Sequence, residues 1–366
     1  YPFVMTPEEE EEWVESIKAE DDEIALEKLR SFQLPKTPGF FQAPSGHRLH
    51  VRTILPSNDP TATEVKAVII HCHGMNSHVN GRNWGGEFLP RVAKEGFAVF
   101  AVDIMGHGYS EGTRALIEDW HDVFDDLEAL AEAIFNDGDE QVGEEDFNAA
   151  IPPEVLERLR RRPLFIDGLS MGGMIGFHLG LRLQEHPRLQ KIFRGAVLGA
   201  PSLQVPMPPE AVSCLLRTFV VPCFSHSSMP AAVSSSSKVQ YGNCYKLSDP
   251  KQKMFAEMEM RDDPLRFPNI GLGWPRNMRW GTAGAFSKVF STMDKDMAKA
   301  KYPFLIIHDP EDKICLVGGS EKLMERSPSA DKQLSRMEAG GFHCITFVDQ
   351  ERYVGLQTSW MKQRLG

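Results

Sequence analysis

Short apolar segments alternate along this chain with longer segments of helical periodicity. Strands are predicted at residues 65–71, 97–102, 163–166, 194–198, 302–308 and 333–337, and several are apolar without interruption, as in strands buried on both faces. Helices are predicted at residues 120–135, 153–161 and 349–364 and directly after Ser170. This alternation is typical of the α/β class, with a mostly parallel, doubly wound sheet.

Two segments near the N-terminus stand outside this alternation. Residues 1–36 carry the capping-box pattern Thr6-Pro7-Glu8-Glu9 and are predicted to form an acidic amphipathic helix. We interpret its glutamates as a solvated face, with a docking tail as the alternative. Residues 40–56 alternate around Ser45-Gly46 in the manner of a β-hairpin. An acidic segment at residues 137–148 is predicted to be a loop.

A long interruption of the alternation follows at residues 202–300. This segment contains prolines, a serine run and apolar clusters, but no buried-strand pattern. A structureless loop of this length is implausible within a compact domain, so we predict a mostly helical inserted cap. The predicted limits are 1–36 for the N-terminal helix, 37–201 and 301–366 for the two parts of the core, and 202–300 for the cap.

Composition and charge narrow the classes of partner. Of the 366 residues, 42% are hydrophobic, which suits a globular protein with a large core. The formal net charge is −11 and no basic stripe offsets it, so we expect no nucleic-acid partner. No apolar stretch reaches the roughly 18 residues of a membrane-spanning helix, and the six cysteines lack C-x-x-C spacing. We expect a cytoplasmic protein, at most peripherally membrane-associated; the start at Tyr1 leaves room for a removed leader.

The most informative motif is Gly168-Leu169-Ser170-Met171-Gly172-Gly173. It places a serine between a predicted strand and a predicted helix, with glycines where a Cβ would collide with the turn. This is the pattern of a nucleophile elbow, which predicts Ser170 as the nucleophile. The backbone N–H of Met171, at the N-terminus of the helix, is the predicted oxyanion donor.

A serine nucleophile needs a histidine base that is itself oriented by a carboxylate. In α/β-hydrolase chain order the acid follows the serine and the histidine comes last. The loop after the fifth predicted strand offers Asp309, Glu311 and Asp312. Asp312 is the predicted acid, and the other two are expected to cap the loop or meet solvent. The predicted base is His343, the only histidine after Asp312.

The turn after the first predicted buried strand reads His73-Gly74-Met75-Asn76. The backbone N–H of Met75 is predicted as a second oxyanion donor, with His73 bracing the loop. An alternative takes His71 and His73 as metal ligands, because they share one face of a strand. No carboxylate or cysteine cluster completes such a site, so we expect neither a metal nor a cofactor. The glycine-rich segment 103–112 is predicted to be a tight loop beside the elbow.

Together these motifs resemble the monoacylglycerol lipase family of α/β-hydrolases, and within it the plant-type branch that includes caffeoylshikimate esterases and lysophospholipase-like enzymes. The matching segments are His73-Gly74, 103–112, 168–173, His308 with Asp312, and 340–343. The resemblance covers roughly residues 38–364 and implies the α/β-hydrolase fold with the triad Ser170, Asp312 and His343. One departure is Asp309, which stands where the family usually has glycine.

The resemblance implies a serine carboxylester hydrolase acting on monoacylglycerols. A lysophospholipase or a small aromatic-ester esterase is the alternative within the enzyme class, and a catalytically inactive receptor or scaffold is the alternative outside it. Substrate choice is expected to lie in the cap. Its apolar residues, among them Leu215, Phe219, Phe255 and Met258, are predicted to contact the ester or lipid substrate and a membrane or micelle that holds it.

Overall fold

The computed structural model describes residues 39–56, 65–81, 84, 87–136, 153–206, 208, 210–229, 243–249, 253, 278–338 and 340–365. The predicted N-terminal helix, the acidic segment 137–148 and the cap residues Phe255 and Met258 lie outside these ranges. Within them, no helix combines the length and the apolar character that crossing a bilayer requires.

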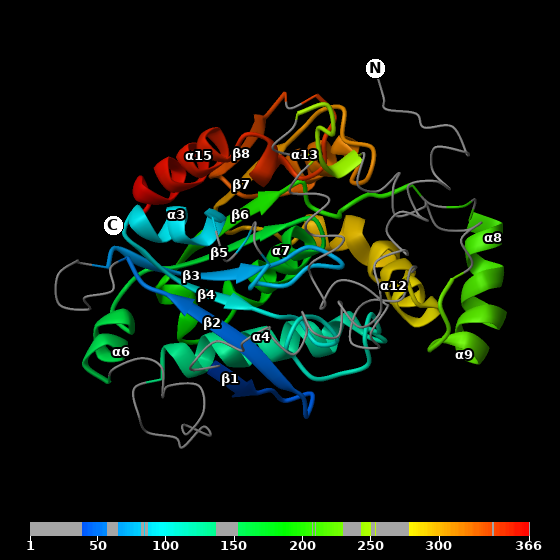
Figure 1. Cartoon of the computed structure of the whole chain (residues 1–366), viewed down its shortest axis with the longest axis horizontal. Coiled ribbons are helices and arrows are strands. Elements are labelled where there is room, and N and C mark those ends of the chain that lie inside the picture. Colours follow the sequence, from blue (N-terminus) through cyan, green and yellow to red (C-terminus); the bar gives the residue numbers. More distant parts are fainter. Residues whose placement is uncertain are drawn as a thin grey trace.

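The described strands form one eight-stranded sheet in the order β1-β2-β4-β3-β5-β6-β7-β8 (Figure 1). β1 pairs antiparallel with β2, and β2 with β4, whereas all other neighbours are parallel. The strands are β1 (Gly39–Gln42), β2 (Arg48–Ile54), β3 (Ala67–Cys72), β4 (Phe97–Val102), β5 (Leu164–Leu169), β6 (Phe193–Gly199), β7 (Phe304–His308) and β8 (Lys332–Arg336). The α/β class, the mostly parallel sheet and the hairpin at 40–56 are therefore confirmed.

The order of the strands fixes where a site can form. From β3 the chain goes to β4 on one side, and it later returns to β5 on the other side. Loops that leave the carboxyl ends of two such strands diverge and leave a crevice between them. The loop after β3 begins at His73, and the turn after β5 holds Ser170.

Helices cover both faces of the sheet (Figure 1). Successive strand residues point to opposite faces, so Ile70 packs in one core cluster with α4 and α7, while Ile69 packs in the other with α3 and α15. The helical elements are α3 (Leu89–Lys94), α4 (Trp120–Ile134), α6 (Pro153–Leu159), α7 (Met171–Leu183), η3 (Leu189–Lys191), α8 (Glu210–Leu215), η4 (Leu216–Val220), α9 (Val221–Phe224), α12 (Trp280–Met297), α13 (Val317–Arg326), α14 (Ile345–Val348) and α15 (Gln350–Lys362).

Glycines bring α7 unusually close to the sheet. A Cβ at Gly172 would lie 1.9 Å from the carbonyl oxygen of Cys72, and one at Gly180 would lie 2.4 Å from the ring of Tyr302. Neither position has room for a side chain. The close approach fixes the N-terminus of α7, and with it Ser170, against the ends of β3 and β5.

Within the predicted cap, the described residues include α8, η4, α9 and α12. The helix α12 packs in the same core cluster as α4 and α7, through Phe286, Val289 and Met293. It therefore serves as the helix that connects β6 to β7 across one face of the sheet. The domain limits drawn at 201 and 300 remain predictions, and α12 is the part of the segment that adheres to the core.

Candidate active site

Ser170 occupies the sharp turn between β5 and α7. Its backbone adopts φ 61° and ψ −119°, a conformation that non-glycine residues rarely take and that strained functional turns store. Its N–H donates to the carbonyl of Gly199 at 2.8 Å, and its carbonyl accepts from Ser202 N–H at 2.9 Å. A Cβ at Gly168 would lie 2.3 Å from the carbonyl oxygen of Gly172. The predicted elbow geometry is present.

Asp312 and His343 meet as predicted. Nδ1 of His343 donates to Oδ2 of Asp312 at 2.7 Å, while Oδ1 accepts the N–H groups of Ile314 (2.8 Å) and Cys315 (3.1 Å). Burial alone would raise the pKa of Asp312, but the charges and hydrogen bonds of His343 and His308 outweigh it and lower that pKa. Burial likewise lowers the pKa of His343, and the charge and hydrogen bond of Asp312 raise it above its ordinary value.

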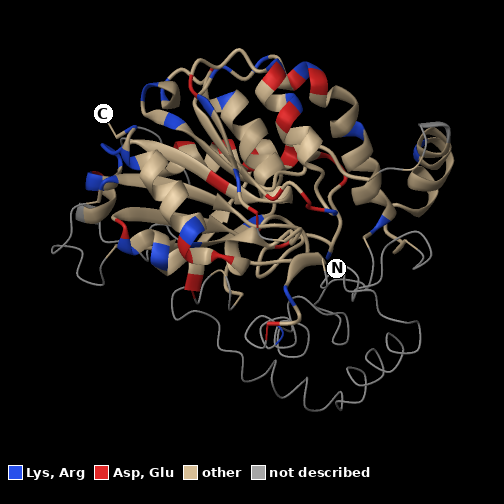
Figure 2. Cartoon of the chain, turned by 90° about the horizontal axis from the view of Figure 1, so that it is seen from above, with Lys and Arg blue, Asp and Glu red and all other residues tan. Residues whose placement is uncertain are grey.

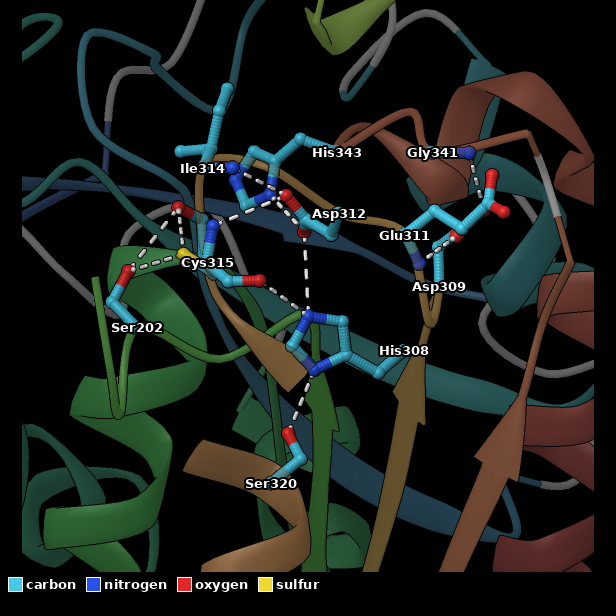
Figure 3. A network of polar contacts seen from close by, with 11 residues as sticks. Ser202, His308, Asp309, Glu311, Asp312, Ile314, Cys315, Ser320, Gly341 and His343 are labelled. Carbon is cyan, nitrogen blue, oxygen red and sulfur yellow. Dashed lines mark hydrogen bonds and ion pairs between the residues drawn. The ribbon is translucent and has the colours of Figure 1, made fainter. Parts of the chain in front are cut away.

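The ring of His308 lies next to the carboxylate of Asp312 and is itself held by hydrogen bonds (Figure 3). Its Nδ1 accepts from the hydroxyl of Ser320 at 2.7 Å, and its Nε2–H donates to the carbonyl of Cys315 at 2.9 Å. The same Nε2 lies 3.4 Å from Oδ2 of Asp312. Because β7 ends at His308, this ring ties the acid loop to the sheet and fixes the direction in which Asp312 faces.

The Ser170 hydroxyl contacts two residues that sequence reasoning missed. Its Oγ lies 3.4 Å from Oγ of Ser202 and 3.8 Å from Sγ of Cys315, and these two side chains are 3.1 Å apart. Among the described residues, His343 makes no direct hydrogen bond to Ser170. Ser202 follows the carboxyl end of β6, and Cys315 lies three residues after Asp312. Position after a strand end was the only available signal for either residue.

The loop after β3 lies against the elbow. A Cβ at Gly74 would be 3.4 Å from the carbonyl oxygen of Leu169 and 3.5 Å from Cβ of Ser170. His73 braces this loop, because its Nδ1–H donates to the carbonyl of Gly74 at 2.7 Å and its Nε2 accepts from Ile104 N–H at 3.1 Å. Burial lowers the pKa of His73 to about 4, so its ring is neutral at pH 7.

These contacts leave His73 without a lone pair for a metal. His71 bonds instead through Nδ1 to Asp167 at 3.0 Å. The described residues contain no group of three or more His, Cys, Asp or Glu arranged to hold a metal ion.

The 103–112 loop is organised around one buried carboxylate. Asp103 accepts the N–H groups of Val79 (2.7 Å) and Tyr109 (3.0 Å) and bonds Nδ1 of His50 (2.9 Å). Burial would raise the pKa of Asp103, but its hydrogen bond to His50 and the neighbouring histidines lower it well below the usual range. The loop is held to the elbow through His73, whose ring accepts from Ile104 N–H and whose own loop lies against Ser170.

A cavity of about 480 Å³ lies at Ser170. Met75, Met171, Ser202, Cys315 and His343 line it, together with apolar cap residues. The apolar cap residues that line it include Val205, Leu216, Val221 and Met278, and Trp280, Phe286 and Phe290 of α12. Phe347 of α14 lines it as well.

The predicted substrate-contacting pair of the cap lies elsewhere. Leu215 and Phe219 are exposed to 57% and 64% and do not line the cavity, whereas Leu216 and Val221 of the same helical segment do. The first pair therefore belongs to the outer surface of the segment, and the second to its inner surface.

Comparison with known proteins shows the family to which the chain belongs. The model of the Hydrolase_4 family, described as serine aminopeptidase, S33, matches residues 63–351. The chain belongs to this family. The hydrolase is also 27% identical over 307 residues to the monoglyceride lipase of Rattus norvegicus, covering 82% of this chain and 81% of the relative. It is 26% identical over 308 residues to the caffeoylshikimate esterase of Arabidopsis thaliana, covering 84% and 78%.

Solved structures show the same fold. The hydrolase superposes on the monoglyceride lipase of Saccharomyces cerevisiae with a TM-score of 0.61, at 18% identity, covering 91% of this chain and 97% of that one. For the monoacylglycerol lipase of Paleococcus ferrophilus the TM-score is 0.60, at 17% identity, covering 86% and 99%. The predicted α/β-hydrolase fold and the resemblance to monoacylglycerol lipases are confirmed, and the chain is a monoglyceride lipase-like hydrolase.

Proposed function

We propose that this hydrolase cleaves carboxylic esters through an acyl-enzyme on Ser170, with His343 as the base and Asp312 as the acid that orients it. The observation that carries this proposal is the buried His343–Asp312 pair, 2.7 Å apart, facing the same cavity as the elbow serine. A carboxylate on Nδ1 leaves Nε2 of the neutral ring to accept a proton.

The reaction proceeds in two halves. Ser170 Oγ attacks the ester carbonyl carbon while Nε2 of His343 takes the hydroxyl proton, and the resulting oxyanion accepts hydrogen bonds from the N–H groups of Met75 and Met171. The imidazolium returns this proton to the departing alcohol, which leaves an acyl-serine. Water then repeats the sequence and releases the carboxylic acid. Because a nucleophile–base hydrogen bond often tightens only in the complex with substrate, the Ser170 hydroxyl is expected to turn from Ser202 toward His343 as the ester binds.

Monoacylglycerols are the proposed substrates. The apolar side chains that line the cavity suit an acyl chain, and a 480 Å³ cavity falls within the range that encloses a small molecule. The relatives named monoglyceride lipase point the same way. The likeness to a caffeoylshikimate esterase supports small aromatic esters as the second candidate.

The cap segment is also proposed to contact the lipid phase that holds the substrate. Among the described residues, the large hydrophobic side chains that are exposed all lie in this segment. They are Val212, Leu215, Phe219 and Phe224, hereafter the apolar patch. Elsewhere, the outer helices carry Lys and Arg interspersed with Asp and Glu in the view of Figure 2. An exposed apolar patch on one segment of an otherwise charged surface is typical of a site that contacts lipid or protein.

A labelling and hydrolysis experiment tests the proposed chemistry. Wild type should react with a fluorophosphonate probe, and Ser170→Ala and His343→Ala should each lower kcat on a short soluble ester by roughly 10³-fold or more while the fold persists. Asp312→Asn should cost less than either. A panel of monoacylglycerols, lysophospholipids and aromatic esters then ranks the substrates. Undiminished turnover by Ser170→Ala, or no probe reaction in wild type, would overturn the proposal.

A further inference from the structure

Asp309 is a buried carboxylate next to the proposed triad with no part in the mechanism above. It directly follows β7, and only 1% of it is exposed. Its Oδ1 accepts the N–H of Glu311 at 2.8 Å, and its Oδ2 accepts the N–H of Gly341 at 3.0 Å. One carboxylate therefore binds both the loop that carries Asp312 and the loop that carries His343 (Figure 3).

The two loops approach each other closely at this point. Gly341 adopts φ +81°, and a Cβ there would lie 3.1 Å from the carbonyl oxygen and 3.3 Å from Cβ of Glu311. His343 is two positions after Gly341, and Asp312 is three positions after Asp309. The loops are thus joined twice within a few residues, by Asp309 with Gly341 and by Asp312 with His343.

These contacts also show that Asp309 is no rival to Asp312. Its two oxygens accept backbone N–H groups on the side of the loop away from the His343 ring, as Figure 3 shows. A hydrogen bond to an ionised carboxylate is roughly twice as strong as a neutral one. A glycine at this position, as in the family that the sequence resembles, has no side chain with which to make either bond.

We propose that Asp309 is a positioning residue, which holds the His343 loop in register with the Asp312 loop so that the imidazole points its Nε2 at Ser170. This inference rests on the proposed role of His343. Without Asp309 the His343 loop would keep the Asp312 bond and the bond from His343 N–H to the Asn243 carbonyl (2.7 Å), but it would lose its hydrogen bond at Gly341, and the alignment of the ring would loosen. Small misalignments of a catalytic group cost about 10²-fold in rate.

Three variants test the proposal. Asp309→Gly removes both acceptors, Asp309→Asn keeps a single acceptor oxygen without the charge, and Glu311→Gln removes one charge from an exposed side chain in the same loop. On a short soluble ester, Asp309→Gly should lower kcat by about 10- to 100-fold with KM within about twofold. Asp309→Asn should lie between this value and wild type, and Glu311→Gln should match wild type.

A pH profile distinguishes positioning from general loss of structure. The rate of fluorophosphonate labelling of Ser170 should fall in Asp309→Gly, and its midpoint should shift to lower pH, because a loosened His343 loses part of the contact with Asp312 that raises its pKa. Thermal melts report folding separately. An unchanged midpoint with only a lower Tm, or rates within twofold of wild type, would overturn the inference. Turnover retained by Ser170→Ala would instead refute the proposed function, and the two failures are thus distinct.

Discussion

Replacing Leu215 and Phe219 of the apolar patch with serine should release the hydrolase from lipid surfaces. Full burial of such a side chain contributes about 1.5–3 kcal/mol. The two side chains are 57% and 64% exposed, so each has roughly 1–2 kcal/mol still to gain from entering a lipid phase. The pair together then contributes at least about 2 kcal/mol, which corresponds to a roughly 30-fold change in the vesicle partition coefficient.

The assay compares wild type with the double variant on uncharged phosphatidylcholine vesicles, where the net charge of −11 adds little. Sedimentation should show the loss of binding, and KM for a long-chain monoacylglycerol in those vesicles should rise about tenfold. Cleavage of a water-soluble acetyl ester should barely change. Cys223→Ser, an isosteric change at another exposed position of the same segment, is the matched control. Unchanged binding and KM would refute the reasoning, as would equal losses on both substrates, which indicate damaged folding.

Two further predictions concern the base and the packing of the elbow. His343 accepts a proton only when neutral, and although burial lowers its pKa, Asp312 raises it above the ordinary value; kcat/KM should therefore rise with pH to a midpoint above about 6.5. Asp312→Asn should move that midpoint down, and a wild-type midpoint below 6.5 would contradict the account. Gly172→Ala places a Cβ 1.9 Å from the Cys72 carbonyl, whereas one at Gly355 meets nothing within 4 Å. Gly172→Ala should cost about 3 kcal/mol of unfolding free energy, Gly355→Ala should gain up to about 1 kcal/mol, and equal Tm shifts would sink this argument.

The sequence was informative wherever a residue's role follows from its position at a strand end. Parallel strands bring their carboxyl ends to one edge of the sheet, so Ser170, Asp312 and His343, each expected after a predicted strand in the chain order of α/β-hydrolases, could be expected to meet. The apolar runs predicted the central strands β3 to β7, because burial on both faces removes polar positions, whereas the sheet-edge strand β8 is polar and only partly buried.

Contacts that depend on tertiary packing could not be predicted in this way. Ser202 and Cys315 reach Ser170 only because β6 and β7 flank each other beyond the elbow. Helical periodicity also could not predict which side chains of the cap face the cavity. Residues 216–220 form a π-helix, whose wider turn shifts later side chains relative to an α-helical pattern. Leu216 and Val221 line the cavity, whereas Leu215 and Phe219 are exposed.

The position of α12 on the core has a consequence for how new specificities arise. Since α12 covers one face of the sheet between β6 and β7, the residues between the end of β6 and the start of α12 are not needed to cover that face. Within that stretch Ser202 N–H bonds the Ser170 carbonyl and the Asn243 carbonyl accepts the His343 N–H, so its length and sequence can vary where these contacts are kept. Grafting the rest of this stretch from a relative with another ester preference, with the contacts of Ser202 and Asn243 retained, is a direct route to a redirected hydrolase.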